Sequence, residues 1–539
     1  MAMFQHRWLK SAGGRVFKSR RAHLLFFTMK SILFIHTSKS EEPLIKFIPL
    51  GLIPLANLLK DKNSVEIVNI VLEKKLDKNF DILDYIKEKG FDIVCLDLQW
   101  HYQTAKVIDT AQEIKEKFPK IKIIIGGYTA SFFYKDIIKF PFIDFVIRGE
   151  AEVPLQKLVD DIEGDLSKVP NLVWKKEDNI VKKQLAEAND MFFENRKSED
   201  FLVVENELSY FADEEILNKL NFTDLSALKN KEQYMQLGLE KNKADNEWYF
   251  IYNAGRGCNV NCSFCSGSKD CAKIITGRNK VIFTDEKKVM QELKKLSESG
   301  LGVWYTTFDP SGLEDYISLF KKIREENLKL RCKFECWKLP TKEFIDEFAL
   351  TFENGSEIIL SLESGSEAVR KKNKGFFFIN DDFMKTIEYL NGKNINAVVY
   401  FTAGLAFETI DDFVETLKLV NELRKYKNVF IFATPIEIEP GSPMFLQPEK
   451  YRIKLKRRNF EDFYNSHKKN SSLGYETEFF SESEIPELVE LIIAAARCRM
   501  SMPVFLKILE NPILREKMNI SKLWESCSIC KFYKECWST

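Results

Sequence analysis

Short apolar runs alternate with amphipathic segments along most of this chain. From Ser31, the runs "SILFI", "VEIVNIV", "DIVCLDL" and "IKIIIGG" are separated by segments with helical spacing, among them "PLGLIPLANLLKD" and "TAKVIDTAQEIKEKF". Short buried runs separated by helices are typical of a parallel sheet with helices on both faces. The pattern therefore predicts a doubly wound, Rossmann-like α/β domain over residues 29–184.

A second region of alternation begins near Trp248. Six apolar runs follow one another with helical segments between them: "WYFIYNAG", "VWYTTFD", "LRCKFECW", "EIILSLESGS", "AVVYFTAGL" and "VFIFATPIEIEPGSP". Six strand–helix units are too few for a closed eight-unit barrel, so the pattern predicts an open, partial (β/α)6 TIM-type barrel over residues 246–445. In barrels of this type the chemistry lies where strands end and loops begin.

The remaining segments are less regular. The stretch "NLVWKKEDNIVKKQ" predicts a hairpin with its turn at Asp178–Asn179, residues 185–245 predict a helical connector, and residues 446–539 form a C-terminal region. Residues 1–28 hold six Lys or Arg and no acidic residue. They are a targeting leader or, as we favour, a mis-assigned start, because "MKSILFIH" from Met29 opens directly on a strand.

The composition and charge of the chain limit the kinds of molecule that we expect it to bind. The chain has 539 residues, of which 45% are hydrophobic, and it carries 80 basic and 80 acidic side chains. A net charge near zero creates no field that would attract nucleic acid or an anionic membrane. No apolar run approaches the roughly 20 residues that a membrane span needs. We therefore expect a cytoplasmic protein with neither nucleic acid nor membrane as partner.

Three of the 11 cysteines lie close together in "RGCNVNCSFCSG", directly after the first strand of the second region. Clustered cysteines in a chain without a secretory signal indicate metal ligands. Cys258, Cys262 and Cys265 could hold three irons of a cubane iron–sulfur cluster and leave the fourth iron open, as a catalytic metal site requires. A zinc site, or an electron-transfer cluster with a distant fourth cysteine, is the alternative.

The spacing C-x3-C-x-aromatic-C, with Phe264 before the third cysteine, resembles the hallmark of the radical S-adenosylmethionine (SAM) superfamily. The resemblance implies a [4Fe-4S] cluster whose open iron is chelated by the amino and carboxylate groups of SAM. One electron then cleaves SAM to a 5′-deoxyadenosyl radical. Phe264 would shield the cluster or pack on its ligand.

The same resemblance assigns residues that contact SAM. Asp309 in "TTFDPSG" would hold the methionine amino group, although this strand end lacks the Gly-Gly-Glu form common in the family. Glu363 and Ser364 in "LSLESGS" match the ribose-binding motif, and a carboxylate can accept from both ribose hydroxyls. Arg370 and Lys374 could pair with the methionine carboxylate, but we favour exposed helix charges.

The first domain resembles the cobalamin-binding domain of cobalamin-dependent radical SAM proteins. The matching features are "PLGLIPLANLL", "GGYTAS" and "DFVIRGEAEVPL", and the paired Gly126 and Gly127 would let cobalamin approach the backbone. The Asp-x-His-x-x-Gly motif that supplies a cobalt ligand in many such domains is absent. We therefore interpret His36 and His101 as strand-end residues, and a degenerate, empty domain stays an alternative.

A last group of cysteines lies near the C-terminus, in "CSICKFYKEC". Cys527, Cys530 and Cys536 could form a second metal site with Cys271 or Cys498 as fourth ligand. Free thiols are the alternative.

Together these features predict a cobalamin-dependent radical methyltransferase acting on an unactivated carbon or phosphorus centre. Its partners would be a small-molecule or peptide substrate and a reductant such as flavodoxin or ferredoxin. The alternatives are a cobalamin-linked radical cyclase or rearrangement enzyme, and a non-catalytic iron–sulfur or cobalamin module. The ribose-type motif favours an enzyme, because an electron carrier has no use for it.

Overall fold

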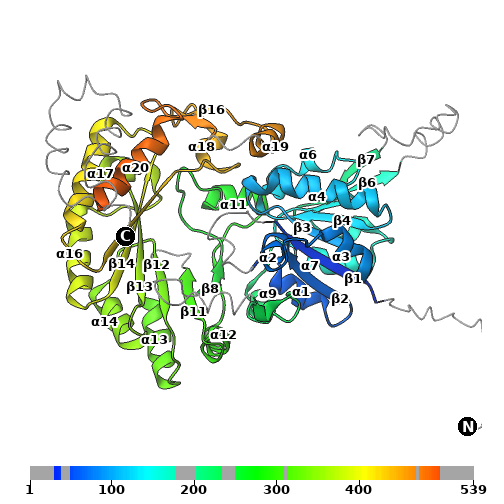
Figure 1. Ribbon diagram of the computed structural model, residues 1–539, viewed down its shortest axis with the longest axis horizontal. Helices are drawn as coiled ribbons and strands as arrows, with labels where there is room; N and C mark the ends of the chain where they lie inside the picture. Colours follow the sequence, from blue (N-terminus) through cyan, green and yellow to red (C-terminus); the bar gives the residue numbers. More distant parts are fainter. Residues whose placement is uncertain are drawn as a thin grey trace, which may run out of the picture.

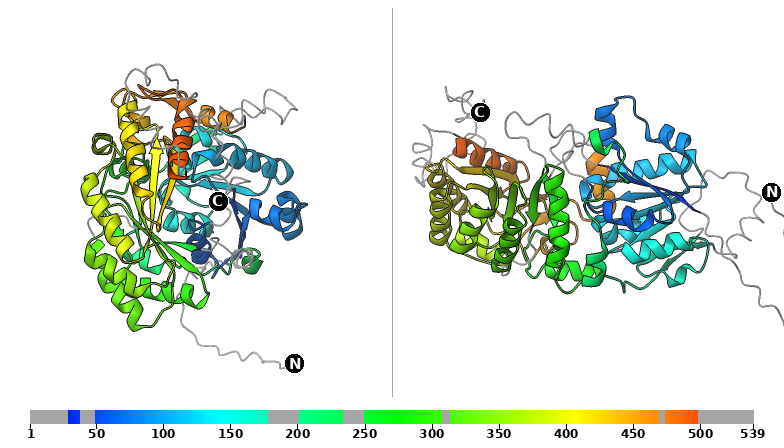
Figure 2. Two further views of the ribbon diagram at one scale, coloured as in Figure 1. Left: turned by 60° about the vertical axis from the view of Figure 1, so that its left-hand side comes forward. Right: turned by 90° about the horizontal axis from the view of Figure 1, so that it is seen from below.

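The computed structural model describes residues 29–37, 49–177, 201–233, 249–306, 313–468 and 473–497. They form two α/β domains that lie side by side (Figure 1), and Figure 2 shows the same arrangement from two further directions. No helix among these residues is long and apolar enough to cross a membrane.

The first domain is built on a seven-stranded sheet with the order β2-β1-β3-β4-β5-β6-β7. Its strands are β1 (Ser31–His36), β2 (Ser64–Asn69), β3 (Ile93–Asp97), β4 (Lys122–Gly126), β5 (Phe145–Ile147), β6 (Leu172–Glu177) and β7 (Phe201–Glu205). The first five strands pair in parallel, and β6 and β7 continue the sheet in antiparallel fashion. The order 2-1-3-4-5 is that of a doubly wound fold, which confirms the prediction and places the topological switch point between β1 and β3.

Both faces of this sheet are covered because its strands are apolar on both sides. In β1, Ile32 and Phe34 face one buried cluster, and Leu33 and Ile35 face another. The covering helices are α1 (Ile53–Leu59), α2 (Ile70–Leu76), α3 (Ile82–Lys89), α4 (Thr104–Lys117), α5 (Tyr128–Phe132), α6 (Tyr134–Ile137) and α7 (Glu152–Asp160).

The prediction of a helical connector over residues 185–245 is wrong at Phe201–Glu205, which form β7. Within it, α9 (Glu214–Lys219) is helical, but β7 is a strand of the first sheet and pairs with β6. "FLVVE" of β7 is apolar at four of five positions, which suits a strand that extends a sheet edge. The predicted turn at Asp178–Asn179 lies outside the described residues.

The second domain is an open sheet of six parallel strands, in the order β8-β11-β12-β13-β14-β15. The strands are β8 (Tyr249–Asn253), β11 (Gly302–Thr306), β12 (Cys332–Cys336), β13 (Glu357–Glu363), β14 (Asn396–Ala403) and β15 (Val429–Pro435). Helices alternate with them: α12 (Glu286–Glu298), α13 (Tyr316–Glu325), α14 (Lys342–Thr351), α15 (Glu367–Asn373), α16 (Asn380–Gly392) and α17 (Ile410–Leu423). The predicted six-unit partial barrel is confirmed.

Further elements complete the second domain and connect it to the first. They are β9 (Gly255–Arg256), β10 (Ile282–Phe283), α11 (Lys269–Thr276), α18 (Pro443–Leu446), β16 (Lys454–Leu455), α19 (Phe460–Lys468), β17 (Tyr475–Glu476) and α20 (Glu484–Arg497). Helix α20 packs on β14 and β15, whereas α19 returns to the first domain and packs on α4 (Figure 1). Phe460 and Phe463 of α19 are buried in the core of the first domain, and the Tyr464 hydroxyl donates to Asp109 at 2.7 Å.

Candidate active site

The three clustered cysteines share one loop between β9 and α11. Gly257 begins this loop with φ +93°, and a β-carbon there would lie 2.7 Å from the Lys280 carbonyl oxygen. Only glycine meets both conditions, so the chain can turn sharply before Cys258. Further along, the amide of Lys269 donates to the Val260 carbonyl at 2.9 Å and closes the loop.

Segments that follow strands β13 and β15 hold this cysteine loop in place. The Ser263 amide donates to the carbonyl of Asn373, the last residue of α15, and the Ser263 carbonyl accepts from the Met444 amide of α18, both at 2.8 Å. The Gly375 amide donates to the Cys262 sulfur at 3.5 Å. A β-carbon on Gly375 would lie 2.4 Å from Val260 Cβ, so the backbone is in direct contact with the loop.

The thiols lie in a setting that disfavours thiolates without a cation. Burial raises the pKa of Cys262, which Lys374 partly offsets, and burial together with Glu439 raises the pKa of Cys265 well above its usual value. Charge on Cys262 or Cys258 would raise the Cys265 pKa further, so both of these sulfurs lie near Cys265. An iron–sulfur cluster fits this loop because its irons would supply the missing positive charge.

Among the described residues, no group of three His, Cys, Asp or Glu side chains converges as one metal ion would require. A cubane instead holds its thiolate ligands at separate corners.

Glu363 lies at the carboxyl end of β13, beside the cysteine loop. Its φ of +63° is unusual for a residue other than glycine, and the register with β14 shifts between Ser361 and Glu363. Burial raises its pKa, and the Lys374 ammonium, bonded to one carboxylate oxygen, opposes that effect. Such backbone strain is often retained at functional sites. The predicted ribose contact would use the other oxygen.

Two expectations about neighbouring residues are corrected. Arg370 and Lys374 are not exposed helix charges, because their side chains are almost fully buried. Arg370 donates to the carbonyls of Ser364 and Phe378, and Lys374 donates to the Ser361 carbonyl at 2.5 Å. These two cations stabilise the turn after β13 from within.

Ser364 and Phe264 are both held by contacts within the second domain. Ser364 is fully buried, and its hydroxyl accepts from the Ser366 amide at 3.2 Å and lies 3.3 Å from the Thr416 hydroxyl. The structure thus places Ser364 inside the turn, and the ribose contact of Glu363 stays a prediction. Phe264 packs against the main core, and its predicted contact with the cluster or its ligand stays a prediction.

The carboxyl edge of the first sheet has polar groups that are free for a ligand. At the switch point, His36 Nδ1 of β1 lies 2.7 Å from Asp97 Oδ2 of β3. Thr37 Oγ1 and Asp97 Oδ1 are buried without a hydrogen-bond partner among the described residues. Buried polar atoms are normally satisfied, so this edge suits the polar groups of a cofactor. His101 is buried, with Nε2 3.2 Å from Glu437 Oε2 of the second domain.

The glycine pair at the end of β4 lets the chain approach the end of β3, and its predicted contact with cobalamin stays a prediction. Gly127 has φ +110°, and a β-carbon there would lie 2.6 Å from the Leu98 carbonyl, so its close neighbour is β3. Gly126 has only ordinary contacts around it. The next residue, Tyr128, reaches the second domain, where its hydroxyl donates to the Ser266 carbonyl at 2.6 Å. Sequence reasoning quoted "GGYTAS" but missed this tyrosine.

Glu439, in the loop after β15, is a second residue that the sequence did not reveal. Its carboxylate accepts from the Ser266 amide at 2.8 Å and from the Ser266 hydroxyl at 2.6 Å. Ser266 follows Cys265 directly, so Tyr128 and Glu439 approach the end of the cysteine loop from two domains. The one signal for Glu439 in the sequence is its position as an acidic residue shortly after the last strand of the second sheet.

A buried ion cluster joins the two domains beside the cysteine loop. Glu150, after β5, accepts from Arg278 at 2.6 and 2.8 Å and from Arg256 at 3.0 Å, and Arg256 also bonds Glu152 at 2.6 Å. Arg278 donates further to the Ala212 carbonyl. Burial would raise the pKa of Glu150, but the two guanidinium groups outweigh it and hold that pKa below its usual value.

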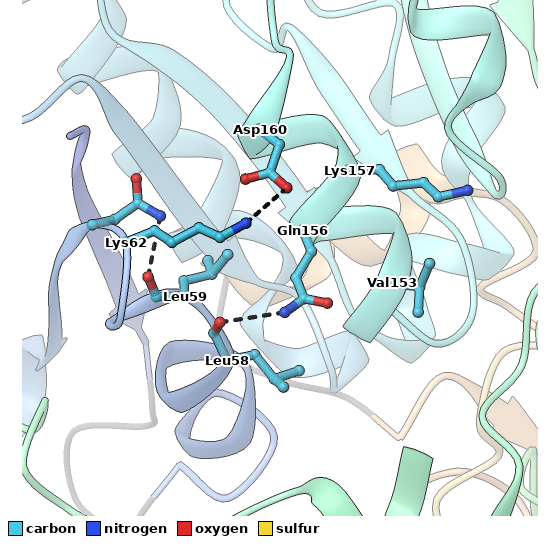
Figure 3. Close-up of a pocket in the computed structure, with 8 residues that line it drawn as sticks. Leu58, Leu59, Lys62, Val153, Gln156, Lys157 and Asp160 are labelled. Carbon is cyan, nitrogen blue, oxygen red and sulfur yellow. Dashed lines mark hydrogen bonds and ion pairs between the residues drawn. The ribbon is translucent and has the colours of Figure 1, made fainter. Parts of the chain in front are cut away.

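A surface pocket of about 250 Å³ lies elsewhere, between α1 and α7 (Figure 3). Leu58, Leu59 and Lys62 line it from the end of α1, which runs away from the carboxyl edge of the sheet. Lys62 and Asp160 pair across it at 3.6 Å. Its position excludes it as part of the cysteine site.

Two families match these two domains. The Radical SAM superfamily matches residues 252–420, which include the cysteine loop and β13, and the B12 binding domain family matches residues 45–159. The chain belongs to the radical SAM superfamily and carries a B12-binding domain. The predicted pairing of the two domains is confirmed.

Relatives of this radical SAM protein include two named as methylating enzymes. An uncharacterised methyltransferase of Pyrococcus horikoshii is 25% identical over 413 residues, which cover 74% of this chain and 77% of that protein. Hopanoid C-3 methylase of Methylococcus capsulatus is 26% identical over 235 residues, 43% of this chain and only 37% of that enzyme.

The fold of the radical SAM protein is also shared by a solved structure. TsrM from Kitasatospora setae, a radical SAM methyltransferase with cobalamin and a [4Fe-4S] cluster bound, has a TM-score of 0.60 at 14% identity. The match covers 90% of each chain, so both domains and their order are shared.

Several predicted residues of the radical SAM protein lie outside the described residues. They are Asp309, Cys498, Cys527, Cys530 and Cys536. Their roles stay predictions. Cys271, the other candidate for a second metal site, is buried on α11.

The first prediction concerns contact between Gly375 and the cysteine loop. Gly375→Ala should lower the iron bound per chain after anaerobic reconstitution, because the new methyl group would displace Val260 and Asn261 at a cost of about 1–3 kcal/mol. Gly392→Ala is the matched control, since a β-carbon there meets nothing within 4 Å. Equal iron content in both variants would show that the contact is unimportant.

The second prediction concerns the ion cluster. Glu150→Gln should lower the free energy of unfolding in urea by about 3 kcal/mol, because it leaves the buried Arg278 without its counter-charge. Glu163→Gln removes a carboxylate that is 76% exposed and should change it by less than about 1 kcal/mol. Equal effects of the two substitutions would contradict the assignment.

Proposed function

We propose that this protein is a cobalamin-dependent radical SAM methyltransferase that acts on an unactivated carbon or phosphorus centre. When bound, the cluster with SAM supplies the 5′-deoxyadenosyl radical, and cobalamin carries the methyl group. We infer that flavodoxin or ferredoxin supplies the electron, and that the substrate is a small molecule or a peptide.

The contact between Tyr128 and Ser266 carries the proposal. Tyr128 follows the carboxyl end of β4, the edge at which a doubly wound sheet binds its ligand, and Ser266 follows the third cysteine. The two expected cofactors would therefore face one interface between the domains. A non-catalytic module has no need for such an arrangement, whereas methyl transfer needs both groups near one substrate.

Residues of this chain have separate tasks in the proposal. Cys258, Cys262 and Cys265 would hold the cluster, and Glu363 would position the ribose of SAM. Thr37 and Asp97 offer polar atoms to cobalamin at the switch point of the first sheet. The names of the methylating relatives support a methyltransferase over a cyclase.

The cluster ligands are tested by single substitutions. Replacing Cys258, Cys262 or Cys265 with Ala should abolish the formation of 5′-deoxyadenosine from SAM and dithionite. The reductive cleavage of SAM requires an intact cluster with one open iron. Cys95→Ala is the control, since this thiol is buried in β3 of the other domain and should not affect cleavage. Retained cleavage in any cluster variant would overturn the proposal.

Cobalamin binding is tested by spectroscopy. The reconstituted protein should bind about one cobalamin per chain, and the paramagnetic resonance of its cob(II)alamin form should show no nitrogen splitting. The chain lacks the Asp-x-His-x-x-Gly motif, and Nδ1 of His36 lies 2.7 Å from Asp97 Oδ2. His36→Gln should therefore leave the spectrum unchanged. Triplet splitting that disappears in this variant would identify His36 as the ligand.

A further inference from the structure

The inner face of the second sheet carries exposed aromatic side chains on its edge strand. Along β15, Val429, Ile431 and Ala433 pack against the core, on the side that α20 covers. The alternate residues Phe430 and Phe432 point to the opposite, inner face and are 46% and 53% exposed. Side chains this apolar are usually covered when a site is filled.

A tyrosine of the neighbouring strand continues this aromatic surface. Tyr400 of β14 is in register with Phe432, and their rings lie 5.7 Å apart and are inclined by 30°. Phe430 pairs in register with the buried Val398. We call Tyr400, Phe430 and Phe432 the aromatic wall.

Tyr400 joins the aromatic wall to the strand that carries the proposed SAM residue Glu363. Tyr400 is in register with Ser361, two residues before Glu363 on β13. Two residues of strand span about 7 Å. A molecule lying on the wall would therefore extend toward the strand ends where the radical is expected.

Two lysines of the second sheet's inner side are paired with carboxylates. Lys333 of β12 alternates with the buried Cys332 and Phe334, and its ammonium lies 3.0 Å from Glu357. Lys374 pairs with Glu363 at the carboxyl end. Burial and the nearby Glu335 and Glu357 carboxylates raise the pKa of Tyr400, so this face disfavours an anionic substrate, whereas an uncharged one leaves both lysine pairs intact.

We propose that the aromatic wall selects a substrate whose reacting part is an uncharged, apolar ring system. This inference rests on the proposed function, because that function places the substrate at the inner face. Flat apolar rings gain from offset or tilted contact with aromatic side chains beyond the area they bury.

Binding of a neutral fluorescent probe tests the wall. We expect N-phenyl-1-naphthylamine to bind the reconstituted full chain, and the double variant Phe430→Ser/Phe432→Ser to weaken that binding on the order of tenfold through the loss of two ring contacts. Phe479→Ser is the matched control, because Phe479 is 47% exposed on a loop after β17 and should not affect the probe. Phe432→Tyr keeps the ring and should retain parent affinity.

Three outcomes would overturn the inference: no probe binding by the parent chain, equal affinity in the double variant, or equal affinity of the parent for the anionic 8-anilinonaphthalene-1-sulfonate. If the double variant loses the probe but Phe432→Tyr does so as well, general unfolding explains the loss, and the inference also fails. Cleavage of SAM by the parent chain is measured separately. If the parent chain binds the probe on the wall but does not cleave SAM, the proposed function alone is refuted. If the parent chain cleaves SAM but the double variant binds the probe as well as the parent, this inference alone is refuted.

Discussion

The bonds that Glu150 makes to Arg256 and Arg278 are the constraint on which the rest of the structure depends. The glutamate belongs to the carboxyl edge of the first sheet, whereas the arginines flank the cysteine loop of the second domain. Buried charges of this kind are costly unless they are fully paired. The first domain therefore supplies the carboxylate and the second domain the guanidinium groups that neutralise it. This pairing holds the two sheet edges that carry the expected cofactors against each other.

Within that frame, the cysteine loop is shaped mostly by backbone contacts. Gly257 and Gly375 let main chains approach where a side chain would collide, and Asn373 and Met444 bond the loop around Ser263. The buried thiols have raised pKa values, so the loop favours an occupant that brings positive charge.

The two faces of the second sheet have different roles. Its helix side is a packed core that includes Phe334 and Phe401, as in other parallel sheets. Its inner side carries paired charges near the strand ends and exposed rings on the edge strand β15. Because six strands leave the sheet open, a substrate can reach this inner side, which the packed interior of a closed barrel would not allow.

The sequence by itself determined the two alternating α/β regions, the open six-strand sheet and the cysteine loop, because strand periodicity and ligand spacing are local properties. It did not indicate β7, whose strand character depends on pairing with β6, nor the burial of Arg370, Lys374 and Ser364. Only the tertiary structure decided that Tyr128 bonds Ser266 and that Glu150 bonds Arg278, pairs separated by 138 and 128 residues. Such contacts depend on how whole domains pack, which no local pattern encodes.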